Sequence, residues 1–269
     1  MTPEDRLRFV QDMLGYGNFT KNTRIAIIGY EEGGVRSWGE VGKDQPMKNK
    51  QDQQKEDDDL LLNFHEALVD GFLPVEKWKT GWENKYAVTE KMQCYLCKKL
   101  RNINVETKEF RAGKFCRDFE VTGNLYSIGK TSKDMRYPDE TRLYFGLQGN
   151  RDDIRTQLLS DKPRWDKFRR LVKNLEERKG LIVFMSMDDT EMGRIKTELF
   201  PQQSFEENLY TGDGYEFSGH SKRKRWRRLE IYATSPACCF VQHPSHGWFN
   251  ESVANRLVTT LKDEHLWTA

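Results

Sequence analysis

The chain has 269 residues, of which 36% are hydrophobic and 32% charged, and its formal net charge is +2. This length is sufficient for one large domain with a substantial core. Its apolar runs are too short to cross a bilayer, and its charged, amphipathic beginning lacks the apolar core of a signal peptide, which excludes an integral membrane protein and favours a soluble, cytoplasmic one.

The first half of the chain predicts helices and one buried strand. A helix is expected over residues 3–14, and the apolar run 24–29, which ends in Gly29, is typical of a buried parallel strand. A loop with two acids and two glycines follows at 30–34. Residues 48–59 include no apolar side chain, so we expect a flexible insertion at about 42–59. Two further helices are expected over 60–69 and 86–100.

The second half alternates strands with helices. Strands are expected over 119–126, 180–185, 229–232 and 238–241. A helical stretch over 152–178 should divide at Pro163, and other helices should begin near Asp188 and Asn250. This alternation predicts a single α/β domain over residues 1–269, with a three-layer α/β/α fold around a central, mostly parallel sheet of four or five strands.

Five cysteines, an odd number, argue against a disulfide scaffold. Cys94 and Cys97 form a CxxC pair with Cys116 further along, but the chain has no second CxxC to complete a zinc site. Cys238 and Cys239 lie in an apolar run and are expected in the core. We therefore expect no metal or other cofactor, and leave open whether Cys94, Cys97 and Cys116 bind a metal.

Polar residues follow four of the expected strands. They are Glu31 and Glu32, Asn124, the 186–189 turn, and His243 in the sequence QHPSHGWF. In an open α/β sheet the carboxyl ends of parallel strands lie at one edge, where ligands bind. These residues are therefore expected to meet in one site.

The order and setting of these segments resemble the uracil-DNA glycosylase superfamily. IAIIGYEEGG resembles its first motif, VTGNLYS its base-reading asparagine motif, LIVFMSMDD its third strand and turn, and QHPSHGWF its last motif. The resemblance spans residues 25–261 and implies a monofunctional DNA glycosylase, which flips a base out of the helix and hydrolyses its N-glycosidic bond to leave an abasic site.

The chemistry of base removal gives the matching residues their expected roles. The reaction needs a carboxylate near an oxocarbenium-like sugar and a hydrogen-bond donor for the departing base. The resemblance favours Glu31 over Glu32 as the catalytic acid, because Glu32 occupies the family's usual proline position. His243 would stabilise the anionic base. Residues expected to bind the base are Asn124, Tyr30, Gly33 and Gly34.

Departures from the family pattern point to an unusual base. Gly33 and Gly34 stand where the uracil-specific branch has a tyrosine that closes the pocket, so we expect a bulky or modified base, as in defence against phages with modified DNA. His246 replaces a common proline. Trp248 or Phe249 is expected to enter the base stack, although both fit equally well as core residues below a helix.

DNA is the expected partner of a monomeric protein. The run KRKRWRR over 222–228 supplies six cations for phosphate contacts, and Ser245, Ser127 and Lys130 are further candidates. The residues expected to bind DNA are the cations Lys222, Arg223, Lys224, Arg225, Arg227 and Arg228 and, in the last motif, Ser245, His246, Trp248 and Phe249.

Two other interpretations fit the same sequence. A metal-dependent nucleotide or phosphoester hydrolase would gather Glu31, Glu32, Asp188 and Asp189 around a cation. A DNA-binding module without catalysis would need the basic run but not Glu31, Asn124 or His243. Activity in the presence of a chelator separates the first alternative from a glycosylase.

Overall fold

The structure is a computed structural model, and it describes residues 2–12, 14–17, 24–33, 62–63, 87–104, 120–130, 137–185, 187–210, 228–242 and 249–268. For residues 15–17, 31–33, 62–63, 87–91, 120, 122 and 129–130 it describes the backbone alone. None of the helices in these ranges is long and apolar enough to cross a membrane.

One sheet runs through the described part of the chain, with strand order β3-β1-β4-β2-β5-β7-β6. Its central strands β4, β2, β5 and β7 are mutually parallel, and β6 is antiparallel to β7. These five form the main sheet, which confirms the predicted mostly parallel arrangement, and two short strands extend it beyond β4. The strands are β1 (Gly15–Gly17), β2 (Ile25–Gly33), β3 (Leu62–Asn63), β4 (Glu120–Lys130), β5 (Leu181–Met185), β6 (Leu229–Tyr232) and β7 (Ala237–Val241).

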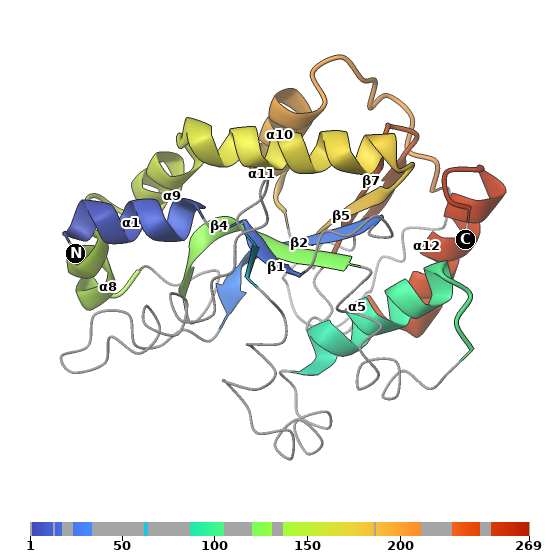
Figure 1. The fold of residues 1–269 in the computed structure, drawn as a ribbon, viewed down its shortest axis with the longest axis horizontal. Coiled ribbons are helices and arrows are strands. Elements are labelled where there is room, and N and C mark those ends of the chain that lie inside the picture. Colours follow the sequence, from blue (N-terminus) through green and yellow to red (C-terminus); the bar gives the residue numbers. More distant parts are fainter. Residues whose placement is uncertain are drawn as a thin grey trace, which may run out of the picture.

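Helices cover both faces of the sheet, as predicted for a three-layer α/β/α fold (Figure 1). Alternation along β2 sends Ala26 and Ile28 into one hydrophobic cluster, and Ile25 and Ile27 into the other. The first cluster includes α1 (Pro3–Asp12), α8 (Asp139–Phe145), α9 (Arg151–Leu159), α10 (Lys162–Glu177) and α11 (Asp189–Leu199). The second includes α5 (Ala87–Leu100) and α12 (Glu251–Asp263).

Local signals in the sequence placed several helix boundaries correctly. Pro163 lies in the first turn of α10 and separates it from α9. Asp188 caps α11, where its side chain accepts from the backbone N–H groups of Thr190 and Glu191. Asn250 caps α12 in the same way through the N–H of Val253. In each case the residues that fix the boundary are neighbours in the chain.

Other boundaries differ from the predictions because long-range pairing sets them. The strand expected to end at Gly29 continues to Gly33, since Glu31 pairs with Tyr126 of β4, and β4 itself continues to Lys130. Asn124 therefore lies within β4 and does not close it. Leu62 and Asn63, expected in a helix over 60–69, instead form β3 beside β1, and a short apolar run does not distinguish the two structures. The rest of that range, like the insertion at about 42–59, lies outside the described residues.

Arg164 of α10 is a buried charge that joins three elements. Its side chain is 4% exposed and donates to the backbone carbonyls of Leu125 (3.1 Å) and Asn124 in β4 and of Gln11 (2.8 Å) in α1. Burial lowers the pKa of the guanidinium to about 10, so Arg164 keeps its charge at neutral pH. The charge is stabilised where it lies by carbonyl dipoles from the sheet and from the end of a helix.

We predict that Arg164→Met destabilises the protein by about 3 kcal/mol or more, because it leaves buried carbonyls of two elements without their donor. Chemical denaturation measures this loss. Arg170→Met is the matched control: Arg170 is an exposed cation of the same helix, and its replacement should change the free energy of unfolding by less than about 0.5 kcal/mol. Equal effects of the two substitutions would contradict the role given to Arg164.

Candidate functional site at the carboxyl edge of the sheet

The parallel strands β4, β2, β5 and β7 end at the same edge of the sheet. After β2 the chain forms β3 and then α5, which packs on one face, whereas after β4 it forms α8, α9 and α10, on the other face. β2 lies between β4 and β5, so the strand order reverses there. Ligands of open α/β sheets bind at such a reversal. The backbone of Glu31 and Glu32 is part of β2 at this point, while their side chains lie outside the description.

Asn124 lies beside the backbone of β2. Its register partner is Gly29, and a Cβ atom added to Gly29 would come within 2.6 Å of the Asn124 side-chain oxygen. The carboxamide therefore occupies space that any other residue at position 29 would fill. Arg164 donates to the backbone carbonyl of Asn124, so the main chain of this residue is held in place. The structure thus brings Asn124 next to the strand that carries Glu31.

A buried polar cluster lies around Glu191 of α11 and includes residues of β2 and β4. The ring of Tyr30 packs against that of Tyr126, with 4.9 Å between centroids, and the Tyr126 hydroxyl donates to Glu191 at 2.9 Å. The backbone N–H of Asp188 donates to the second Glu191 oxygen at 2.8 Å. Tyr30, which precedes Glu31 in the chain, and Tyr126, its partner across the sheet, therefore belong to the Glu191 cluster.

The electrostatics of this cluster keep its hydroxyls neutral. Burial raises the pKa of the Glu191 carboxyl, which is 3% exposed. Burial, with the nearby Glu191, also raises the pKa of Tyr30 and of Tyr126. The Arg155 guanidinium lies 4.9 Å from the centre of the Tyr30 ring, in a cation–π arrangement. The Tyr30 side chain, expected to contact a base, is instead 4% exposed and part of the core.

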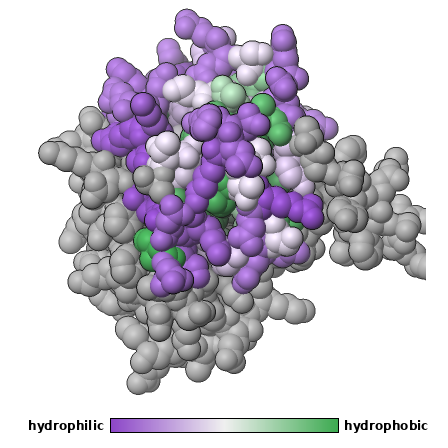
Figure 2. Space-filling view, turned by 90° about the vertical axis from the view of Figure 1, so that its right-hand side faces the viewer, coloured by the Kyte–Doolittle hydropathy of each residue, from purple (hydrophilic) through white to green (hydrophobic). Residues whose placement is uncertain are grey.

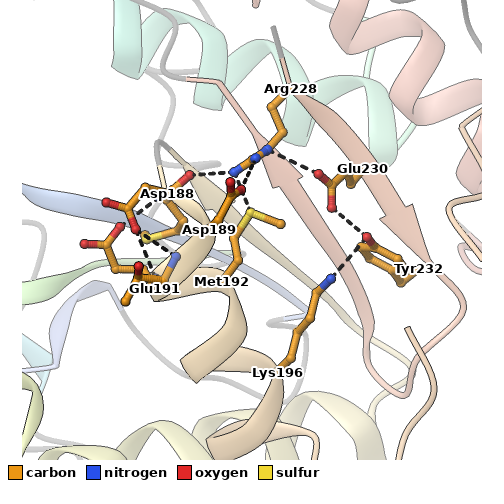
Figure 3. Close-up of polar contacts among 10 residues, drawn as sticks. Asp188, Asp189, Glu191, Met192, Lys196, Arg228, Glu230 and Tyr232 are labelled. Atoms are coloured by element: carbon orange, nitrogen blue, oxygen red, sulfur yellow. Dashed lines mark hydrogen bonds and ion pairs between the residues drawn. The ribbon is translucent and has the colours of Figure 1, made fainter. Parts of the chain in front are cut away.

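Arg228 is the described member of the expected DNA-binding run, and its charge is used within the protein (Figure 3). It pairs with Asp189 and, at 3.2 Å, with Glu230, and it donates to the Met187 carbonyl at 3.0 Å. The Glu230 carboxylate also accepts from the Tyr232 hydroxyl at 2.6 Å. The prediction that Arg228 binds phosphate is therefore corrected: two carboxylates already neutralise it. The other cations of the run, Lys222, Arg223, Lys224, Arg225 and Arg227, lie outside the described residues.

The segment of the last motif begins next to Arg228. The backbone N–H of Gln242, the residue before His243, donates to the Arg228 carbonyl at 2.9 Å. His243, Ser245, His246 and Trp248 lie outside the described residues, as does Gly34. Phe249 is 1% exposed and belongs to the core cluster of α5 and α12, so the core interpretation replaces the expectation that it enters a base stack.

The described acids and cysteines that were considered as metal ligands make other contacts in the structure. Asp188 caps α11 and Asp189 pairs with Arg228. Cys94 and Cys97 are buried in α5, and burial raises the pKa of the Cys238 and Cys239 thiols. Within the ranges that the structure describes, no three His, Cys, Asp or Glu side chains are grouped as metal ligands. Cys116 lies outside those ranges.

Sequence reasoning did not single out Glu191, Tyr126 or Arg164. A signal for Glu191 was present, since Asp188 and Glu191 have the spacing of a capping box, in which cap and third residue bond reciprocally. The contacts of Tyr126 and Arg164 join residues 65 and 40 positions apart, and a single sequence does not reveal such pairs.

Comparisons of this chain with known proteins found no match. No family model matches the chain, and neither a curated protein nor a solved structure matches it. The resemblance to the uracil-DNA glycosylase superfamily therefore remains a prediction from the motifs.

We predict that Glu191 makes the stability of the protein fall as pH rises. Its pKa in the folded protein lies above the ordinary value of 4.5, so the folded state binds this proton more tightly than the unfolded state. The contribution is present below pH 4.5 and is lost as pH rises through the folded pKa. Denaturant unfolding from pH 4.5 upward should show a smaller fall in Glu191→Gln than in the wild type.

The exposed Glu176 of α10 provides the control for this titration. Glu176→Gln makes the same chemical change at the surface and should alter the free energy of unfolding by less than about 0.5 kcal/mol. An unchanged pH dependence in Glu191→Gln would show that the buried carboxyl does not titrate as described.

Proposed function

We propose that this protein is a DNA glycosylase that hydrolyses the N-glycosidic bond of a flipped base. The observation that supports this proposal best is the position of Asn124. Its carboxamide lies against Gly29, two residues before Glu31, at the point where the strand order reverses. A base-reading amide and a carboxylate on adjacent strands are the pair of groups that base excision requires.

In this proposal the carboxylate acts on the sugar and the amide on the base. Glu31, or Glu32 beside it, stabilises the oxocarbenium-like sugar and orients the attacking water. Asn124 bonds the edge of the flipped base, and His243 stabilises the negative charge that develops on it. Tyr30, which precedes Glu31 in the chain, packs in the core against Tyr126, the partner of Glu31 in β4.

The substrate we propose is a bulky or modified base in DNA. Gly33 and Gly34 follow the two acids and add no side chain to the pocket. Such a specificity suits a defence enzyme that acts on modified phage DNA. Proposed DNA contacts come from the cations of 222–227 and from Ser245, His246 and Trp248, with Arg228 and Phe249 now removed from this set.

A metal-dependent phosphoester hydrolase receives less support from the described residues. It would need Asp188 and Asp189 near Glu31 and Glu32, but Asp188 caps a helix and Asp189 pairs with Arg228. A DNA-binding module without catalysis makes a different prediction, because its function would not depend on Glu31.

We predict base release that persists in the presence of a chelator. The protein should be incubated with DNAs that contain uracil, mismatched thymine or hypermodified cytosine, and abasic sites assayed. One substrate should yield abasic sites, and Glu31→Ala should lower the single-turnover rate by about 100-fold or more. Release that requires a divalent metal would support the hydrolase alternative, and DNA binding without any release would support the binding module.

A pair of glycine substitutions tests the role of Asn124 within this assay. Gly29→Ala places a methyl group against the Asn124 side chain, which must move, so base release should fall towards the level of Asn124→Ala while the fold is kept. Gly193→Ala in α11 meets no atom within 4 Å and should leave base release unchanged. If Gly29→Ala retains wild-type release, Asn124 does not read the base from this position.

A further inference from the structure

The two sides of α12 differ in chemistry. Its inner face buries apolar residues, whereas a groove lies along its outer side. The helix contributes five residues to the groove, spaced along one side: Ser252, Asn255, Arg256, Thr259 and Thr260. Four of these five side chains are short, polar and uncharged.

The opposite wall of the groove is a segment held against the edge of the sheet. Leu209 and Tyr210 line the groove, and the Leu209 N–H donates to the Ile231 carbonyl of β6 at 2.9 Å. The side chain of Asn208 accepts from the Ile231 N–H at 2.9 Å and from the Tyr210 N–H at 3.1 Å. These bonds fix the wall, and the groove between it and α12 has a volume of about 550 Å³.

The chemistry of the lining suits an anion with several oxygens. Among the seven lining residues, Arg256 carries the charge, and Tyr210, Ser252, Thr259 and Thr260 offer hydroxyls. The Arg256 guanidinium reaches across the groove to the Tyr210 hydroxyl at 3.4 Å. Arginine with hydroxyl groups, and no carboxylate among these seven, is the set that phosphate oxygens of a nucleic-acid backbone bind.

The groove is also placed to continue the candidate site. α12 follows the carboxyl end of β7 and the segment that contains His243, and Ser252 lies in its first turn. Hydrophilic residues predominate on the described part of the face seen in Figure 2, on the side of the molecule where α12 lies in Figure 1. A nucleic-acid strand bound at the edge of the sheet would meet a polar surface as it extends along the helix.

We propose that this groove binds the backbone phosphates of DNA, with Arg256 as the cation and the hydroxyls of α12 and Tyr210 as further donors. The inference rests on the proposed function in taking DNA as the ligand. It adds a phosphate-binding surface outside the strand-end motifs and outside the basic run 222–228.

The test is the salt dependence of DNA binding by the full chain, measured with a fluorescent duplex in chelator. Arg256→Gln should weaken binding about 3- to 10-fold at low salt and reduce the slope of log K against log salt by about 0.9, the loss of one phosphate contact. Thr259→Glu, which places a carboxylate in the groove, should also weaken binding. Arg170→Gln is the matched control, because it removes an exposed cation of α10 on the opposite face of the sheet.

The two assays distinguish failure of the groove proposal from failure of the glycosylase proposal. An effect of Arg256→Gln on the salt slope, without base release from any DNA, would support the groove while the glycosylase fails. Equal slopes for Arg256→Gln and Arg170→Gln, or a wild-type protein that binds no DNA at low salt, would overturn the groove whatever the base-release assay shows.

Discussion

The buried Arg164 is the interaction on which the arrangement of the candidate site depends. β1 pairs with β4 at residues 121–123, and beyond Gly123 the outer side of β4 has no such partner among the described strands. The Arg164 guanidinium bonds the carbonyls of Asn124 and Leu125 just after this point, and a carbonyl near the end of α1 as well. One cation thus satisfies acceptors that a sheet edge and a helix end leave open. Because Asn124 is one of the residues held, the same bond that stabilises the fold also positions the proposed base-reading group.

Buried polar groups connect the carboxyl edge to the helices of one face. The Glu191 carboxylate accepts a hydrogen bond from the Tyr126 hydroxyl. Tyr30, which precedes Glu31 in the chain, packs against the Tyr126 ring. Further along the edge, Arg228 links the start of α11 to β6 through Asp189 and Glu230 (Figure 3). Glu191 and Asp189, which hold these two sets of contacts, both lie in the first turn of α11. This turn therefore connects the ends of β2, β4, β5 and β6.

The sequence indicated the features that neighbouring residues determine. Pro163 divided two helices, Asp188 began another, and the apolar runs marked β5 and β7. It did not indicate how far β2 and β4 extend, because polar residues such as Glu31 enter a strand when another strand pairs with them. It also misplaced side chains whose partners are distant. In the sequence Arg228 is one of six cations in a basic run, but in the structure it pairs with Asp189 and Glu230. The sequence is compatible with Phe249 either as a DNA wedge or as a core residue, and its burial identifies it as core.

The proposed function requires DNA to bind at the carboxyl edge of the sheet, around the end of β2. Hydrogen exchange of the full chain, measured with and without a duplex that carries a non-hydrolysable abasic-site analogue, tests this requirement. DNA should slow the exchange of backbone amides in residues 29–33 of β2 and 124–130 of β4. Slower exchange confined to α8 and α9, with no change at 29–33, would contradict it.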